Sequence, residues 1–188
     1  MMPKTDEFCT LLEQSIPHLR AYGRSLTHNA DAADDLVQDA LVRAWAAREQ
    51  FQPGTNFKAW AFTILRNRFL DQRRRDRGSN ESIDDLRHDA LVARPAQDVV
   101  VQFDDMARAF WRLNPHHREI LMLVGANGLS YEEAANVIGC AVGTVRSRLS
   151  RARTELQSVI ERGRNGTDQR RSSGEFGAIE FLRALAAA

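Results

Sequence analysis

The sequence predicts an all-helical protein made of two small helical domains joined by a flexible acidic linker. Apolar residues recur at helical spacing through both halves, and no alternating run typical of a strand stands out. A segment rich in acidic residues, with Gly and Pro, separates the halves. At 188 residues, the chain has room for one domain or two small ones. The predicted limits are 1–77 and 99–163 for the domains, 78–98 for the linker and 164–188 for the tail.

The first domain should begin with two helices. One covers about Phe8 to Leu26, where Pro17 predicts a kink or a break. Residues 29–31 form a turn with side chains that cap helices, and a helix over 31–45 follows. Aspartates in the first turns of this second helix favour the positive end of its dipole, which supports the assignment.

The helix over 31–45 should have one packed face and one free face. The apolar helical spacing places on the packed face Leu36, Ala40, Leu41 and Trp45. The free face carries Asp35, Gln38, Asp39 and Val42. Taken alone, this pattern is typical of a plain amphipathic core helix with a solvated acidic face.

A third helix should begin at Thr55 or Asn56, directly after a Pro-Gly turn. Trp60 and Phe62 share helical spacing with the apolar residues that follow, so we expect them in the core and not stacked on a base. The helix should continue to a strongly basic end, Arg73 to Arg75.

Residues 78–98 differ in composition from the segments on either side. Five acidic side chains oppose two arginines there, and apolar residues are sparse. Such a segment is largely irregular when alone, so each flanking domain should have its own core. The tail ends in an Ala/Leu-rich stretch that could be a docking helix or a remnant of cloning, and we assign it no role.

The second domain should contain a helix that starts at Pro115 with Asn114 as its cap. Beyond it, residues 129–153 have the pattern of a helix-turn-helix. Ser130 and Glu133 have the spacing of a capping box, which satisfies free backbone N–H groups at a helix start. Gly139 follows where a tight turn needs an unhindered backbone.

The last helix of this motif should open near Val142 and bury Val145 and Leu149 along one stripe. If that stripe faces inward, the residues that face outward are Thr144, Arg146, Ser147, Arg148 and Arg151. Guanidinium groups stay charged and match base edges and phosphates, so the pattern suits the major groove of DNA. A solvated basic helix on an ordinary helical protein is the plain alternative.

Positive charge is concentrated in two segments. Residues 66–77 hold six arginines and two aspartates, and residues 140–154 hold four arginines and no acid. The net charge of +1 is therefore the sum of two basic patches and an acidic connector. Two basic helices on two domains predict two contacts with nucleic acid. Within the first segment, Asp71 could accept from a cytosine amino group or pair with Arg75, and we favour the pair.

Other kinds of site find no support in the sequence. Cys9 and Cys140 form no CxxC and have no histidine companions, so we expect no disulfide framework, no metal site, no cofactor and a reducing cytoplasm. No stretch has the roughly 18 apolar residues of a membrane span. His116 and His117 lie at an exposed helix start, and we find no catalytic triad, so we expect no catalytic residue and no enzyme.

Three segments together resemble bacterial extracytoplasmic-function sigma factors, the two-domain sigma subunits of RNA polymerase. They are DAADDLVQDALVRAW at 31–45, NFKAWAFTILRNRFLDQRRR at 56–75 and AVGTVRSRLSRAR at 141–153. The resemblance spans about Phe8 to Glu161 and is greatest to the general-stress-response subgroup of alphaproteobacteria. It implies that the first domain is region 2, which binds the polymerase clamp and opens the −10 element. It implies that the second domain is region 4, which binds the −35 element.

The resemblance also implies roles for individual residues. The residues implied to bind core RNA polymerase are Asp35, Gln38, Asp39 and Arg43. Those implied at the −10 element are Arg66, Asn67, Arg68, Arg73, Arg74 and Arg75, with Asn67 as the base reader. Those implied at the −35 element are Thr144, Arg146, Ser147, Arg148, Arg151 and Arg153. A serine often opens the recognition helix in the family, whereas this chain has Ala141.

The predicted partners are core RNA polymerase, promoter DNA and an anti-sigma protein, with no membrane span. Two alternatives remain open. One is a module that mimics a sigma factor to capture an anti-sigma protein, although both arginine helices are intact and no phosphorylatable receiver domain would fit in this chain. The other is a helix-turn-helix regulator that acts without polymerase, although the first domain shows no sensor chemistry.

Overall fold

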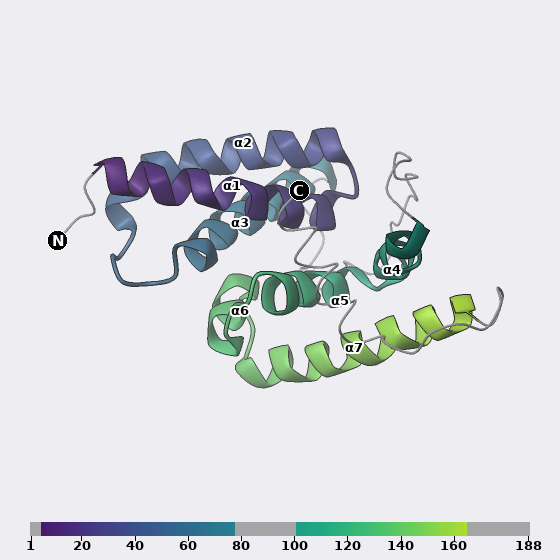
Figure 1. Cartoon of the computed structure of the whole chain (residues 1–188). Helices are drawn as coiled ribbons and strands as arrows, with labels where there is room; N and C mark the ends of the chain where they lie inside the picture. The colour runs from purple at the N-terminus through teal and green to yellow at the C-terminus, as the bar shows by residue number, and fades with distance from the viewer. Residues whose placement is uncertain (1–4, 78–100, 165–188) are drawn as a thin grey trace.

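A computed structural model describes residues 5–77 and 101–164, and every regular element in these two ranges is helical. The all-helical prediction is therefore confirmed for the described residues. The predicted linker at 78–98 and the tail from 165 onward lie outside them. We call residues 5–77 the amino-terminal block and residues 101–164 the carboxy-terminal block (Figure 1).

The amino-terminal block contains α1 (Thr5–Thr27), α2 (Ala30–Ala46), the short 3-10 turn η1 (Arg48–Gln50) and α3 (Phe57–Arg77). Of the predicted kink or break at Pro17, the break is excluded, because α1 continues through the proline as one helix. Leu19 and Tyr22, which follow the proline, are buried, so tertiary packing on the next turns favours the continuous helix over the local tendency of proline.

Asparagine side chains begin both later helices of this block. The Asn29 side chain accepts a hydrogen bond from Ala32 N at 3.0 Å, which caps α2. Asn56 Oδ1 accepts from Lys58 N at 3.1 Å, so Asn56 and not Thr55 starts α3. Between α1 and α2, His28 has a φ of +57°, a left-handed conformation that histidine adopts more readily than most residues.

The carboxy-terminal block contains α4 (Val101–Arg112), α5 (Pro115–Ile120), the π-helix η2 (Leu121–Ala126), α6 (Tyr131–Ile138) and α7 (Val142–Arg164). Asn114 caps α5 as predicted, accepting from His116 N at 2.9 Å. The helix then widens into η2, which the sequence did not indicate. Asn127 closes this wider turn, because its backbone N and its side-chain Nδ2 both donate to Met122 O.

The helix-turn-helix is confirmed in detail. Ser130 and Glu133 form both halves of the capping box at the start of α6. Gly139 ends α6 with a φ of +73°, in the left-handed region that glycine adopts without strain. Val145 and Leu149 of α7 are buried as predicted.

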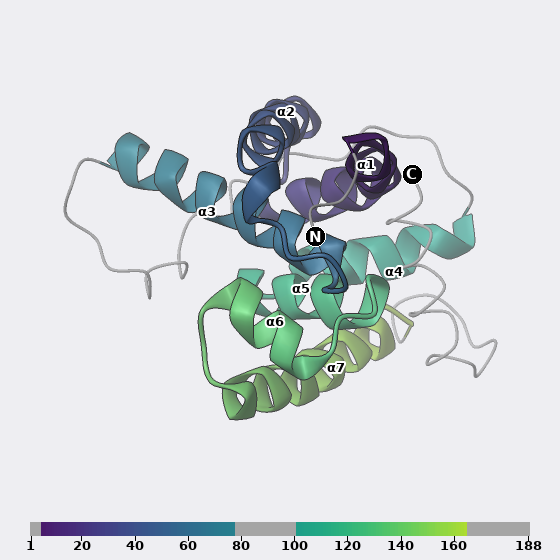
Figure 2. The ribbon, with the colours of Figure 1, turned by 90° about the vertical axis from the view of Figure 1, so that its left-hand side faces the viewer.

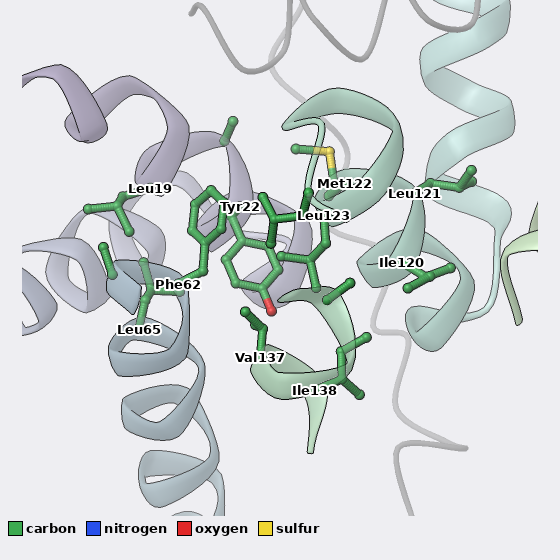
Figure 3. Packing of buried hydrophobic residues seen from close by; sticks show 14 of the residues in the cluster. Leu19, Tyr22, Phe62, Leu65, Ile120, Leu121, Met122, Leu123, Val137 and Ile138 are labelled. Atoms are coloured by element: carbon green, nitrogen blue, oxygen red, sulfur yellow. The ribbon is translucent and has the colours of Figure 1, made fainter. Parts of the chain in front are cut away.

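The two blocks form two layers, with α1, α2 and α3 in one and α4 to α7 in the other (Figures 1 and 2). α6 packs on α3, and α1 packs on α5. Figure 3 shows Tyr22 and Phe62 of one block facing Leu123 and Val137 of the other within a single hydrophobic cluster. The apolar residues of the two blocks are therefore in contact as one continuous cluster, and the expectation that each block folds by itself stays a prediction.

Two glycine substitutions should change the free energy of unfolding in opposite directions. Gly139→Ala forces a Cβ into the left-handed region and should destabilise the protein by about 1 kcal/mol. Gly143 lies inside α7 with open space around it, so Gly143→Ala should stabilise by about 0.5–1 kcal/mol. Urea unfolding followed by circular dichroism measures both. Equal signs for the two variants would contradict this account of the turn.

Candidate nucleic-acid interface

The outward face of α7 carries the predicted −35 residues. Arg146, Arg151 and Arg153 are exposed, whereas Thr144, Ser147 and Arg148 are half-buried. Figures 1 and 2 both place α7 on the far side of α5 and α6 from the amino-terminal block. Contact between the blocks therefore leaves the outer face of this helix open to a ligand.

Local contacts orient part of this face. The Arg146 guanidinium lies over the ring of Tyr131, 5.9 Å from its centroid, where the ring face attracts a cation. Ser147 Oγ donates to Thr144 O at 3.0 Å, so the hydroxyl keeps only acceptor capacity for a ligand. Ala141 offers no side-chain cap to α7, and its carbonyl accepts from the backbone N–H groups of Thr144 and Val145.

The carboxy-terminal end of α3 projects beyond the helices around it (Figure 2). Asn67, Arg74 and Arg75 are exposed on this helix. The Asp71 carboxylate lies 3.8 Å from the Arg74 guanidinium. The expected partner, Arg75, was therefore wrong, and Asp71 pairs with Arg74. Arg73 lies over the Phe69 ring, 5.7 Å from its centroid. These residues form a basic arm with one exposed amide at its base.

Arg66 differs from the other predicted −10 residues because only 6% of its surface is exposed. Its Nε donates to Glu119 Oε1 at 2.7 Å, and Tyr22 donates to the same oxygen at 2.8 Å. Burial is the largest single influence on the pKa of Arg66 and lowers it, but the Glu119 charge, the Tyr22 phenol and the hydrogen bond to Glu119 together raise that pKa above its usual value. In this arrangement, Arg66 is a buried cation between the two blocks and is not accessible to DNA.

Arg68 and Asp39, predicted at two separate sites, contact each other. Arg68 Nε and Nη2 donate to Asp39 Oδ2 at 2.8 and 2.7 Å, which ties α3 to α2. The two residues lie 29 positions apart, so no spacing rule could have paired them. The link connects the predicted polymerase-binding helix directly to the predicted −10 helix.

The outer face of α2 combines charge with exposed apolar surface. Asp35, Gln38 and Arg43 are exposed as expected, and Val42 is 70% exposed. Trp45 was expected on the packed face but is 40% exposed. Its ring makes an edge contact with Phe8 at 6.1 Å and lies under the Arg48 guanidinium, 5.2 Å from the ring centroid, while Ala44 fills the buried position beside it. Exposed tryptophan beside aliphatic and charged groups is typical of a protein-binding surface.

Sequence reasoning missed two residues at the contact between the blocks. Glu119 is 3% exposed and accepts from two helices of the other block. Arg118 is also buried, and its Nη1 donates to Leu113 O at 2.8 Å. Burial lowers the pKa of Arg118 to about 10. The available signal was two adjacent charged residues directly before the apolar run 120–124.

Within the described ranges, no helix has both the length and the apolar character that crossing a membrane requires.

Models of two protein families match the two blocks. A model of Sigma-70 region 2 matches residues 11–79, and a model of Sigma-70 region 4 matches residues 104–156. The first match contains α2 and α3, and the second contains the helix-turn-helix.

Individual relatives match over most of the chain. The ECF RNA polymerase sigma factor EcfG of Rhodopseudomonas palustris is 45% identical over 159 residues, which cover 85% of this chain and 88% of EcfG. The sigma factor CnrH of Cupriavidus metallidurans is 34% identical over 139 residues, covering 68% of this chain and 73% of CnrH.

A solved structure extends this likeness to the fold. The sigma factor RpoE of Bartonella quintana, in complex with the anti-sigma factor NepR, superposes with a TM-score of 0.67 at 40% identity. That alignment covers 85% of this chain and 100% of the other. The chain therefore belongs to the extracytoplasmic-function family of RNA polymerase sigma factors, of the EcfG stress-response type, which bind core polymerase and direct promoter recognition and transcription initiation.

Proposed function

We propose that this sigma factor directs polymerase to stress-response promoters through three surfaces: the outer face of α2, the basic arm of α3 and the outer face of α7. The observation that carries the proposal is their separation on the molecule. Two exposed basic helix faces lie on different blocks, and α2 presents mixed apolar and charged residues without a cover. Each surface has the chemistry of a different partner.

The face of α2 is the proposed site for core polymerase. Val42 and Trp45 would lose exposed apolar area on binding, and Asp35, Gln38 and Arg43 would surround them with polar contacts. Asp39 belongs to the same proposed site but is held by Arg68. Binding at α2 can therefore change the position of α3 through this ion pair.

The outer face of α7 is the proposed site for the −35 element. A recognition helix lies in the major groove, where a guanidinium can donate to guanine O6 and N7 together. Arg146 and Arg148 are the proposed base readers, with Thr144 and Ser147 beside them. Arg151 and Arg153 lie further along the helix and are proposed to bind phosphate.

The arm of α3 is the proposed site for the opened −10 element. An amide offers a donor and an acceptor, so exposed Asn67 can read the edge of a base that has left the stack. Arg73, Arg74 and Arg75 would neutralise the phosphates of the separated strand. Arg66 and Arg68 belong to the same proposed set, and each would first have to exchange a carboxylate for phosphate.

The related sigma factors indicate a further partner and a place of action. We propose that an anti-sigma protein restrains the chain, since the related RpoE was solved with NepR and the related CnrH with a domain of CnrY. The protein would act in the cytoplasm, where polymerase meets the chromosome. It would bind and orient partners, while the polymerase carries out the chemistry.

Transcription with core polymerase tests this function. A module that only mimics a sigma factor to capture an anti-sigma protein would give no transcript. Asp35→Lys with Val42→Lys should weaken co-elution with core enzyme by about tenfold or more, because a central apolar contact is lost and a charge is reversed. Glu13→Lys, an exposed charge reversal on α1, is the matched control and should co-elute as wild type. Unchanged co-elution of the α2 variant with normal helicity would refute this placement.

Arg148→Ala and Arg153→Ala should weaken binding to the −35 element in different ways. Loss of a base reader costs about 1–3 kcal/mol and relaxes preference at one base pair, whereas loss of a phosphate contact weakens all sequences alike. Fluorescence anisotropy of the holoenzyme with point-mutated −35 duplexes measures both effects. Uniform losses in both variants would contradict base reading by Arg148.

Asn67→Ala should spare binding to duplex promoter and slow strand opening. Its contact forms only after a base leaves the stack, so about 1–3 kcal/mol is lost from the open complex alone. Permanganate reactivity of −10 thymines measures opening. Gln72→Ala, which removes the other amide of α3, is the control and should open at the wild-type rate. Opening at that rate by Asn67→Ala would exclude Asn67 as the base reader.

A further inference from the structure

Three polar side chains from three helices meet at the contact between the two blocks. Tyr22 of α1 and Arg66 of α3 come from the amino-terminal block, and Glu119 of α5 comes from the carboxy-terminal block. Both donors bind the same oxygen, Glu119 Oε1, at 2.8 and 2.7 Å. All three are buried, so this cluster is a desolvated charged contact between segments far apart in the chain.

Apolar side chains from both blocks surround the cluster. The Tyr22 ring meets the edge of Phe62 at 5.0 Å, and Val137 and Leu123 approach from the other block (Figure 3). A charge buried in such surroundings is stable only while its partner stays in place. Burial, followed by the Glu119 charge, raises the pKa of Tyr22 well above its usual value, so the phenol remains a donor.

Weaker polar and aromatic contacts continue along the same interface. Lys58 Nζ lies 3.4 Å from Asn127 O, and the ring centroids of His28 and Trp111 are 4.7 Å apart. The contact between the blocks therefore has several parts, with the charged cluster at its centre.

The distance between promoter elements shows that this arrangement cannot bind both at once. Centres named −10 and −35 are about 25 base pairs apart, roughly 85 Å of duplex at 3.4 Å per base pair. In the structure, α6 packs against both α3 and α7, so the axes of these two helices are about two helix spacings, or roughly 20 Å, apart. The blocks must separate before α3 and α7 can occupy the two elements.

We propose that the Tyr22–Arg66–Glu119 cluster is a lock that holds the free protein in a closed, promoter-incompetent form. Opening breaks the Arg66–Glu119 pair and frees Arg66 for the phosphate that the −10 element offers. This regulation rests on the proposed use of α3 and α7 as DNA-binding surfaces. Closure and promoter binding are then mutually exclusive, because they compete for the same guanidinium.

Two substitutions weaken the lock with little change in volume. Tyr22→Phe removes one hydrogen bond to a charged acceptor, and Glu119→Gln removes the charge that compensates Arg66. Each should shift the closed-to-open equilibrium by about tenfold or more. Arg20→Gln, which breaks an exposed ion pair with Asp34 inside the amino-terminal block, is the matched control and should leave the equilibrium unchanged.

Single-molecule energy transfer on the full chain measures this equilibrium directly. Dyes are attached after Gln14→Cys on α1 and Gln157→Cys on α7, both exposed, with Cys9 and Cys140 replaced by serine. Wild type and control should show mainly the high-transfer state, and both lock variants should populate a low-transfer state while keeping wild-type helicity. High transfer retained by Tyr22→Phe overturns the lock, even if Glu119→Gln fails to fold.

Binding of promoter DNA by the free protein separates a lock from a merely stabilising contact. The lock variants should bind a duplex that carries both promoter elements more tightly than wild type does, by up to the factor that the energy-transfer shift gives. An open population without tighter binding would mean that the cluster only stabilises the fold, and the proposal would be overturned. Failure of wild-type protein to support transcription would instead refute the proposed function, and the energy-transfer result would be unaffected by it.

Discussion

Burial of the Arg66–Glu119 pair between two helical blocks is the constraint around which the structure is arranged. An uncompensated charge at this depth would cost several kcal/mol, so α3 and α5 must remain in register while the blocks are in contact. Tyr22 of α1 donates to the same Glu119 oxygen, so a third helix takes part in this contact. The surrounding cluster of apolar residues then becomes one core, because both blocks contribute to it. The same contact therefore buries apolar surface, pairs the buried charges and fixes the relative position of the two layers.

This arrangement divides the functional surfaces into two groups. The outer faces of α2 and α7 and the end of α3 remain exposed, because the contact between the blocks uses the opposite faces of these elements or their neighbours. The middle of α3 is covered, and Arg66 with it. With α3 and α7 on one promoter, as proposed, the free energy of the contact between the blocks opposes promoter binding. A polar centre suits a contact that must be broken, because the separated ions regain hydration.

Several features could be predicted because they depend on neighbours in the chain. Asn29, Asn114 and the Ser130–Glu133 pair cap helices through backbone groups a few residues away. The motif pattern also identified Asn67 and most arginines on exposed helix faces. The error at Trp45 arose because a local pattern was used where packing against other helices decided the outcome, and the same packing keeps α1 continuous through Pro17. The partners of Arg66 and Arg68 could not be predicted, since they lie 53 and 29 positions away.

Residues close together in the chain therefore set the helical class, the order of the elements, the caps and turns and the two segments of positive charge. These depend on propensity, hydrogen bonding and periodicity within a few residues. Packing between distant helices decides which of those charged side chains are exposed and able to bind a ligand. Burial and pairing depend on where the distant Glu119 and Asp39 lie, and that position follows from packing of whole helices. Arg66 and Arg75 look alike along the chain, yet in the described residues Arg66 is a buried ion paired with Glu119 of another helix and Arg75 is an exposed cation.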